Sequence, residues 1–109
     1  MDIQHKNLAA GGWRTLSLAE QMGNIGSEVS RAARAEGKDK TSFENAVLRA
    51  LELFDLTIDD PRWRNRLREI ERAREVFSDA ATGGREYQSS LADLENYFLH
   101  FALLARKGM

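Results

Sequence analysis

The histidines of this 109-residue chain are few, and their spacing does not suit a metal site. The chain holds two histidines, His5 and His100, and no cysteine. A di-iron site in a helical bundle needs inward glutamates together with paired Glu-x-x-His motifs, and neither histidine follows a glutamate at that spacing. The absence of cysteine excludes thiolate ligands, disulfides and thiol catalysis. We therefore expect no metal site and no cofactor.

Serine nucleophiles have no better support. The serines have explanations as helix caps or surface residues, and no base lies at a spacing that would activate one. The stretch 23–26, Gly-Asn-Ile-Gly, superficially resembles the loop that clamps nucleic acid in KH domains. It lies within a continuous helical stripe, however, so packing explains its glycines better. The sequence thus predicts a non-enzymatic protein without catalytic residues.

A cluster of arginines is the strongest charged feature of the chain. Six arginines lie between positions 62 and 74. Arginine side chains suit phosphate binding and stacking on rings. However, Glu69, Glu71 and Glu75 belong to the same segment, which favours a salt-bridged, solvated helix. The alternative is a contact with a polyanion or an acidic partner, with these candidate residues: Arg62, Arg64, Arg66, Arg68 and Arg72.

Composition places the chain among soluble globular domains. The net charge of −1 at pH 7 gives no overall basic excess that would attract nucleic acid. The length suits one domain, and no apolar run is long enough to span a membrane. We expect a cytoplasmic protein without a membrane partner. Residues 1–12 are expected to form a flexible lead-in, and residues 13–109 a single helical bundle.

Four segments carry the start and stop signals of helices. Ser or Thr followed by an acidic residue three positions later resembles a capping box and predicts helices over about 17–36, 42–57 and 90–106. Asp60 followed by Pro61 predicts a further helix over about 61–80. Trp13, ahead of the first cap, is expected to fold back onto the first turn. Four helices with short connections favour an all-α fold, an up-down-up-down four-helix bundle.

The first predicted helix organises the others. Its apolar stripe recurs at steps of four and three, through Leu18, Met22, Ile25, Val29 and Ala32. Beside that stripe lies a ridge of small residues that includes Gly23 and Gly26. Glycine inside a helix costs roughly 1 kcal/mol relative to alanine, so these two indicate close packing against bulky side chains near the end of the chain.

The last predicted helix carries more apolar surface than one core face needs. Every residue from 91 to 105 is apolar except Asp93, Glu95, Asn96 and His100. A surface helix needs an apolar stripe only a little wider than about 100°. The excess could be hidden by a central position, by the N-terminal segment, or by sharing between identical chains. We favour sharing, in a symmetric homo-oligomer, most simply a dimer, whose interface includes Leu48, Leu56, Leu99 and Leu103.

A further pattern resembles a known family. Residues 24–26, Asn-Ile-Gly, with the later Phe43, Ala46, Leu48 and Leu51-Glu52, resemble the Asn-Ile-Ala-Glu-Gly and Phe-x-x-x-Leu-x-x-Ala pattern of a bacterial four-helix-bundle family. That family includes proteins encoded in intervening sequences of large ribosomal RNA, and the accessory variability determinant (Avd) of diversity-generating retroelements. The resemblance covers about thirty residues and implies a ring-shaped pentamer. For an Avd-like protein it implies work with a reverse transcriptase and RNA.

These features predict a homo-oligomeric interaction or scaffold protein. The alternative is a nucleic-acid-associated accessory protein that contacts RNA or DNA with the arginines of the third helix. A binder of small ligands, with a pocket between helices, is a third hypothesis.

Overall fold

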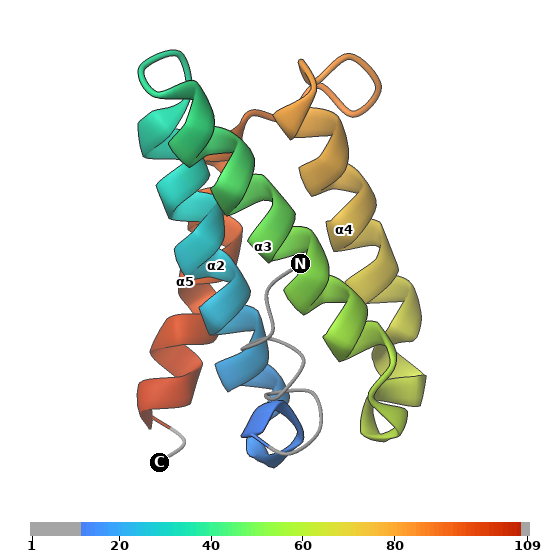
Figure 1. Cartoon of the computed structure of the whole chain (residues 1–109). Coiled ribbons are helices and arrows are strands. Elements are labelled where there is room, and N and C mark those ends of the chain that lie inside the picture. The colour runs from blue at the N-terminus through green and yellow to red at the C-terminus, as the bar shows by residue number, and fades with distance from the viewer. Residues whose placement is uncertain (1–11, 108–109) are drawn as a thin grey trace.

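The computed structural model describes residues 12–107, and every regular element in that range is helical. The elements are η2 (Trp13–Thr15), α2 (Leu18–Ala35), α3 (Lys40–Ile58), η3 (Pro61–Arg66), α4 (Leu67–Ala81) and α5 (Leu91–Lys107). The four α-helices alternate in direction, and α2 packs against both α3 and α5 (Figure 1). The all-α prediction is confirmed for this range, and the arrangement is compatible with a four-helix bundle. The predicted lead-in lies outside the described residues, apart from Gly12.

Local capping signals fix the ends of α2 and the start of α5. Ser17 Oγ accepts from the backbone N–H of Glu20 at 3.1 Å, and Glu20 Oε1 accepts from that of Ser17 at 2.8 Å. Ser90 and Asp93 form the same reciprocal pair ahead of α5, at 3.0 Å in both directions. After α2, Gly37 adopts a φ of +74°, a left-handed conformation that glycine reaches without steric cost. The capping boxes predicted at the starts of the first and last helices are confirmed.

The start predicted for the second helix is wrong. α3 begins at Lys40 rather than Ser42, and its N-cap is Asp39 rather than Thr41. The Asp39 carboxylate accepts from the backbone N–H of Ser42 at 3.1 Å and from its hydroxyl at 2.8 Å. Aspartate ranks above threonine as a helix cap, so the earlier of two competing caps takes the helix end.

The third predicted helix is not continuous. Pro61 does follow the Asp60 cap, but residues 61–66 form the 3-10 helix η3, in which Trp63 leaves helical geometry at φ −102° and ψ 25°. In this conformation the indole N–H of Trp63 donates to Gln21 Oε1 of α2 at 2.9 Å. A tertiary hydrogen bond thus competes with the helical pattern, and the regular helix begins only at Leu67.

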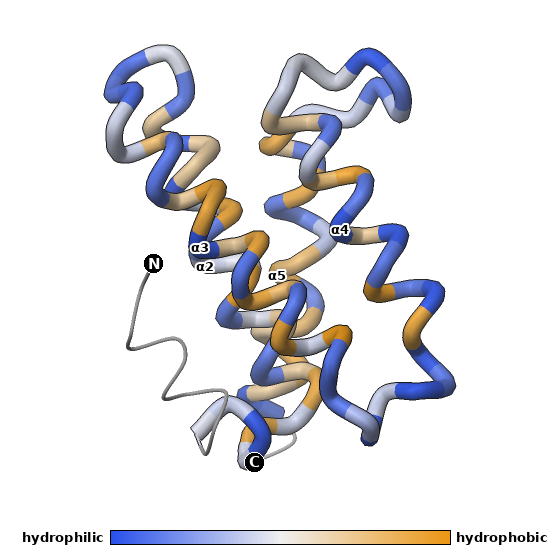
Figure 2. The backbone as a smooth tube through the Cα atoms, turned by 45° about the vertical axis from the view of Figure 1, so that its right-hand side comes forward, coloured by the Kyte–Doolittle hydropathy of each residue, from blue (hydrophilic) through white to orange (hydrophobic). Residues whose placement is uncertain are grey.

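The core lies where three helices contribute a phenylalanine each. Phe54 of α3 lies 6.0 Å from Phe77 of α4 and 5.9 Å from Phe98 of α5, measured between ring centroids. All three side chains are fully or almost fully buried. Figure 2 shows hydrophobic and hydrophilic residues alternating along α4, as expected for a helix that buries one side. The shared aromatic cluster holds α4 to the rest of the molecule.

The glycines of α2 let α5 approach closely. A Cβ atom added at Gly26 would lie 2.6 Å from Phe98 Cβ, which is far inside van der Waals contact. A Cβ added at Gly23 would lie 3.4 Å from the Ala102 Cα, an ordinary contact distance. Gly26 therefore has no room for a side chain, whereas Gly23 can accommodate a methyl group.

A buried polar cluster joins the elements at the end of the bundle drawn at the bottom of Figure 1. It consists of Trp13, Gln21, Thr57, Asp60 and Trp63. Trp13 Nε1 donates to Thr57 Oγ1 at 3.2 Å, and Gln21 Nε2 donates to the Trp13 carbonyl at 2.8 Å and to Asp60 Oδ2 at 3.2 Å. Trp13 thus reaches α3 as well as the first turns of α2. Because buried polar groups need partners, these bonds fix how η2, α2, α3 and η3 meet.

We expect Asp60 to make folding stability depend on pH in acid. Hydrogen bonds from the Arg62 guanidinium lower the pKa of Asp60 from 3.8 to about 2, although burial opposes the shift. A lowered folded-state pKa gives stability that is complete above about pH 4 and is lost as the pH falls toward 2. The loss should be about 2 kcal/mol. Urea unfolding of the parent chain and of Asp60→Asn across this range measures it, because only the parent should lose this contribution. An equal difference between the two proteins at every pH would contradict the expectation.

Candidate functional site

Two of the five arginines proposed as a polyanion contact are held by carboxylates. Arg62 pairs with Asp60 at 2.7 Å and also donates to the carbonyl oxygen of Leu16 at 2.8 Å. Arg66 pairs with Glu69, one turn later. These guanidinium groups fix local structure, so a polyanion would have to compete with their present partners.

The other three arginines are more accessible. Arg72 lies over the ring of Tyr87, with its guanidinium carbon 5.4 Å from the ring centroid. Arg64 and Arg68 are exposed, and within residues 12–107 no ion pair or ring contact involves them. The structure therefore does not assemble the five arginines into one unpaired basic surface.

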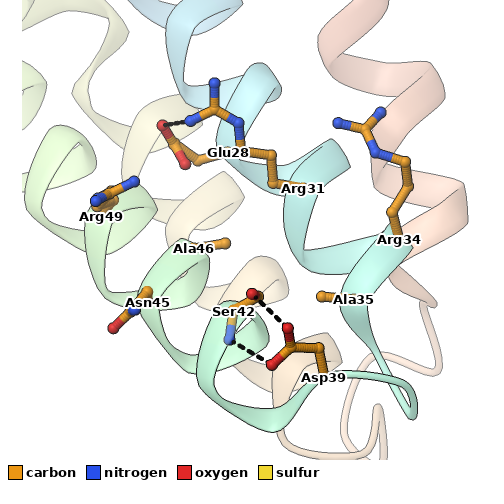
Figure 3. A pocket seen from close by; sticks show the side chains of 9 residues that line it. All are labelled: Glu28, Arg31, Arg34, Ala35, Asp39, Ser42, Asn45, Ala46 and Arg49. Carbon is orange, nitrogen blue, oxygen red and sulfur yellow. Dashed lines mark hydrogen bonds and ion pairs between the residues drawn. The ribbon is translucent and has the colours of Figure 1, made fainter.

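A polar pocket of about 500 Å³ lies between α2 and the first turns of α3 (Figure 3). Glu28 on its wall pairs with Arg31 through Oε2 at 3.0 Å. Its other oxygen, Oε1, is buried and has no hydrogen-bond partner among the described residues. Figure 3 shows the guanidinium groups of Arg31, Arg34 and Arg49 lying apart from one another. Because they do not converge, the pocket presents no preformed clamp for an anion.

A second pocket, of about 430 Å³, separates α4 from α5. Its apolar wall comes from Ala73 and Val76 of α4 and from Leu94 of α5, and Tyr97 lies beside them. Burial raises the pKa of Tyr97 to about 12, and the nearby carboxylate of Glu69 adds to the effect. A phenol that stays protonated near neutral pH is a poor general base, so the pocket offers apolar contact rather than acid–base chemistry.

The residues considered for metal binding are not brought together. Within the described part of the chain, no three His, Cys, Asp or Glu side chains are placed to hold a metal ion. His100 is exposed on α5, and His5 lies outside the described residues.

Exposed leucines are the most distinctive surface feature. Leu99, Leu103 and Leu104 of α5 are 52%, 45% and 56% exposed, and Leu48 of α3 is 59% exposed. Leu56, predicted at the same interface, is instead half-buried and packs against the core. α3 packs mainly against α2 and α4, and α5 packs mainly against α2, so Leu48 lies on a different helix from the other three exposed leucines. The sequence showed Leu104 as apolar, but helical periodicity alone did not single it out.

We call Leu99, Leu103 and Leu104 the α5 leucine face. Glu95 lies about one helical turn before its first residue, and Arg106 follows its end. Beside Leu99, a small groove of about 170 Å³ is lined in part by Ser27 and Ser30 of α2. His100 lines a shallow pocket on this face together with Leu103 and Leu104. Apart from His100 the face is apolar, with an acidic residue at one end and a basic residue at the other.

No protein-family model, curated protein or solved structure matches this chain. The helices of residues 12–107 include none with the length and hydropathy needed to cross a membrane.

Proposed function

We propose that this chain is a non-enzymatic interaction module that forms a symmetric homo-oligomer through the α5 leucine face. The observation that carries the proposal is the exposure of three leucines on one helix. Full burial of a leucine side chain is worth about 1.5–3 kcal/mol, so copies that share this face recover part of that free energy. Grouped exposed apolar side chains of this kind mark association surfaces.

The other two ways of hiding the apolar excess of α5 have less support within residues 12–107. α5 is not central, because its outer leucines are about half exposed. Trp13 is the large side chain nearest the N-terminus of this range. It is 2% exposed and belongs to the buried polar cluster, so it does not cover the leucines of α5. Sharing between copies remains the best-supported way to cover the face.

We expect sedimentation analysis across a micromolar concentration series to give a mass above the 12.3 kDa of one chain. The double variant Leu99→Gln/Leu103→Gln should raise the dissociation constant of the oligomer about tenfold or more, because each copy loses two apolar contacts. Leu48→Gln is the control, since it replaces a leucine of α3 that is 59% exposed by the same residue type. A parent chain that stays monomeric at every concentration would overturn the proposal.

A nucleic-acid-associated role, as an Avd-like accessory protein of a reverse transcriptase, is the alternative. Its support is the accessibility of Arg64 in η3 and of Arg68 at the start of α4, four positions apart in the sequence. Retention on immobilised RNA that disappears when both are reversed to Glu, with the helical signal intact, would favour this role over simple self-association.

A further inference from the structure

We infer that the partner of the α5 leucine face is a second copy of the same face, packed antiparallel about a twofold axis near position 101. This inference rests on the proposed function and adds the orientation and the stoichiometry. Its basis is the arrangement of leucines and charges along one side of α5.

The leucines set the register. Leu99 and Leu103 are four residues apart, about one helical turn, so they form a short stripe on one side of the helix. A twofold axis midway between them places Leu99 of each copy against Leu103 of the other. The same contact occurs twice, so both leucines of both copies lose their exposure to water.

The charges agree with that register. Glu95 and Arg106 are eleven residues apart, about three turns, and therefore lie on the same side of the leucine stripe. Their midpoint coincides, within about half a residue, with the midpoint of the two leucines. An antiparallel pair that joins the leucines thus brings Glu95 of each copy to Arg106 of the other. Among the described residues, neither side chain has an ion-pair partner in its own chain.

The surroundings of Glu95 leave space for this contact. Ser27 and Ser30 of α2 line the groove beside Glu95 and Leu99, and their small side chains keep it open. A long arginine side chain from a second copy can lie along such a groove while its guanidinium reaches the carboxylate.

Other arrangements of two copies use the same residues less well. A parallel pair would set Glu95 against Glu95 and Arg106 against Arg106, which is repulsive at both ends. In a head-to-tail ring, this face of one copy would pack against a different surface of the next copy. Glu95 and Arg106 would then not pair with each other across the interface. The face is self-complementary only in the antiparallel arrangement.

A charge-swap experiment on the full chain tests the inference. We expect Glu95→Lys and Arg106→Glu each to raise the dissociation constant of the dimer about tenfold at low ionic strength, because each turns two attractions into two repulsions. The double variant Glu95→Lys/Arg106→Glu should return to within about threefold of the parent chain. Glu44→Lys, the same charge change on an exposed position of α3, is the control and should leave the dissociation constant unchanged. Circular dichroism checks that each variant keeps its helices.

The outcomes separate this inference from the proposal beneath it. The antiparallel pairing is wrong, and the interaction function stands, if Leu99→Gln/Leu103→Gln dissociates the assembly while the single charge reversals leave the dissociation constant unchanged. The same conclusion follows if Glu95→Lys/Arg106→Glu has a dissociation constant as high as those of the single charge variants. A mass of five chains also overturns the pairing, since a twofold contact closes at two. A parent chain that is monomeric would overturn both the antiparallel pairing and the proposed self-association.

Discussion

Replacing Gly26 by alanine is expected to lower the free energy of unfolding by about 3 kcal/mol. The added methyl group would lie 2.6 Å from Phe98 Cβ, and both atoms are attached directly to helix backbones. Rotation of a side chain cannot relieve the collision, so α2 and α5 would have to separate and lose contacts around the core. Leucine at this position adds three further carbons and should cost more. Thermal and urea unfolding, followed by circular dichroism, measure the effect.

Gly23→Ala is the matched control, because it makes the same change three residues earlier in the same helix. Its new methyl group would lie 3.4 Å from the Ala102 Cα, which is ordinary contact. The gain in helix propensity, roughly 1 kcal/mol, should offset the local adjustment and leave stability almost unchanged. Equal melting temperatures for the two alanine variants would mean that close packing does not explain Gly26.

Replacing Gln21 by methionine is expected to lower the free energy of unfolding by about 2–4 kcal/mol. Methionine is close to glutamine in volume, so the change removes hydrogen bonds with little effect on packing. The indole N–H of Trp63 loses its acceptor, and the carbonyl oxygen of Trp13 loses its side-chain donor. Asp60 retains its bonds from Arg62, so the cost comes mainly from the two tryptophans. The free energy of unfolding in urea gives the magnitude directly.

Asn24→Met provides the comparison for this substitution. Asn24 is an exposed amide on the same helix, and the same replacement there should change stability by no more than about 0.5 kcal/mol. If Gln21→Met unfolds at the same denaturant concentration as Asn24→Met, the buried polar cluster contributes nothing to stability.

Much of the local structure is predictable because the interactions that decide it join near neighbours in the sequence. The capping boxes at Ser17 and Ser90 connect residues three positions apart, and Gly37 ends α2 through its own backbone freedom. Even the wrong start of α3 has a local cause, since Asp39 and Thr41 compete for one helix end two residues apart. A sequence can show both caps without showing which one is used.

Prediction was weaker where surfaces meet. The apolar width of α5 was readable from its composition, but helical periodicity cannot say which leucines a neighbouring helix will cover. Leu56 and Leu99 both look surplus to one core face, yet Leu56 packs against the core and Leu99 is 52% exposed. The same limit applies to the arginines. Arg62 is paired with Asp60 and Arg64 is exposed, and residue type alone does not distinguish them.

The sequence by itself therefore determined the helical class, the number of main helices and most of their ends, all of which depend on contacts within one or two turns. Only the tertiary structure decided the break at Trp63, the buried polar cluster and the exposed face of α5. Trp63 bonds to a glutamine 42 positions away and Trp13 to a threonine 44 positions away. Such bonds exist only after the helices have packed. Their strength comes from burial, which removes the competing water and leaves each polar group dependent on one distant partner.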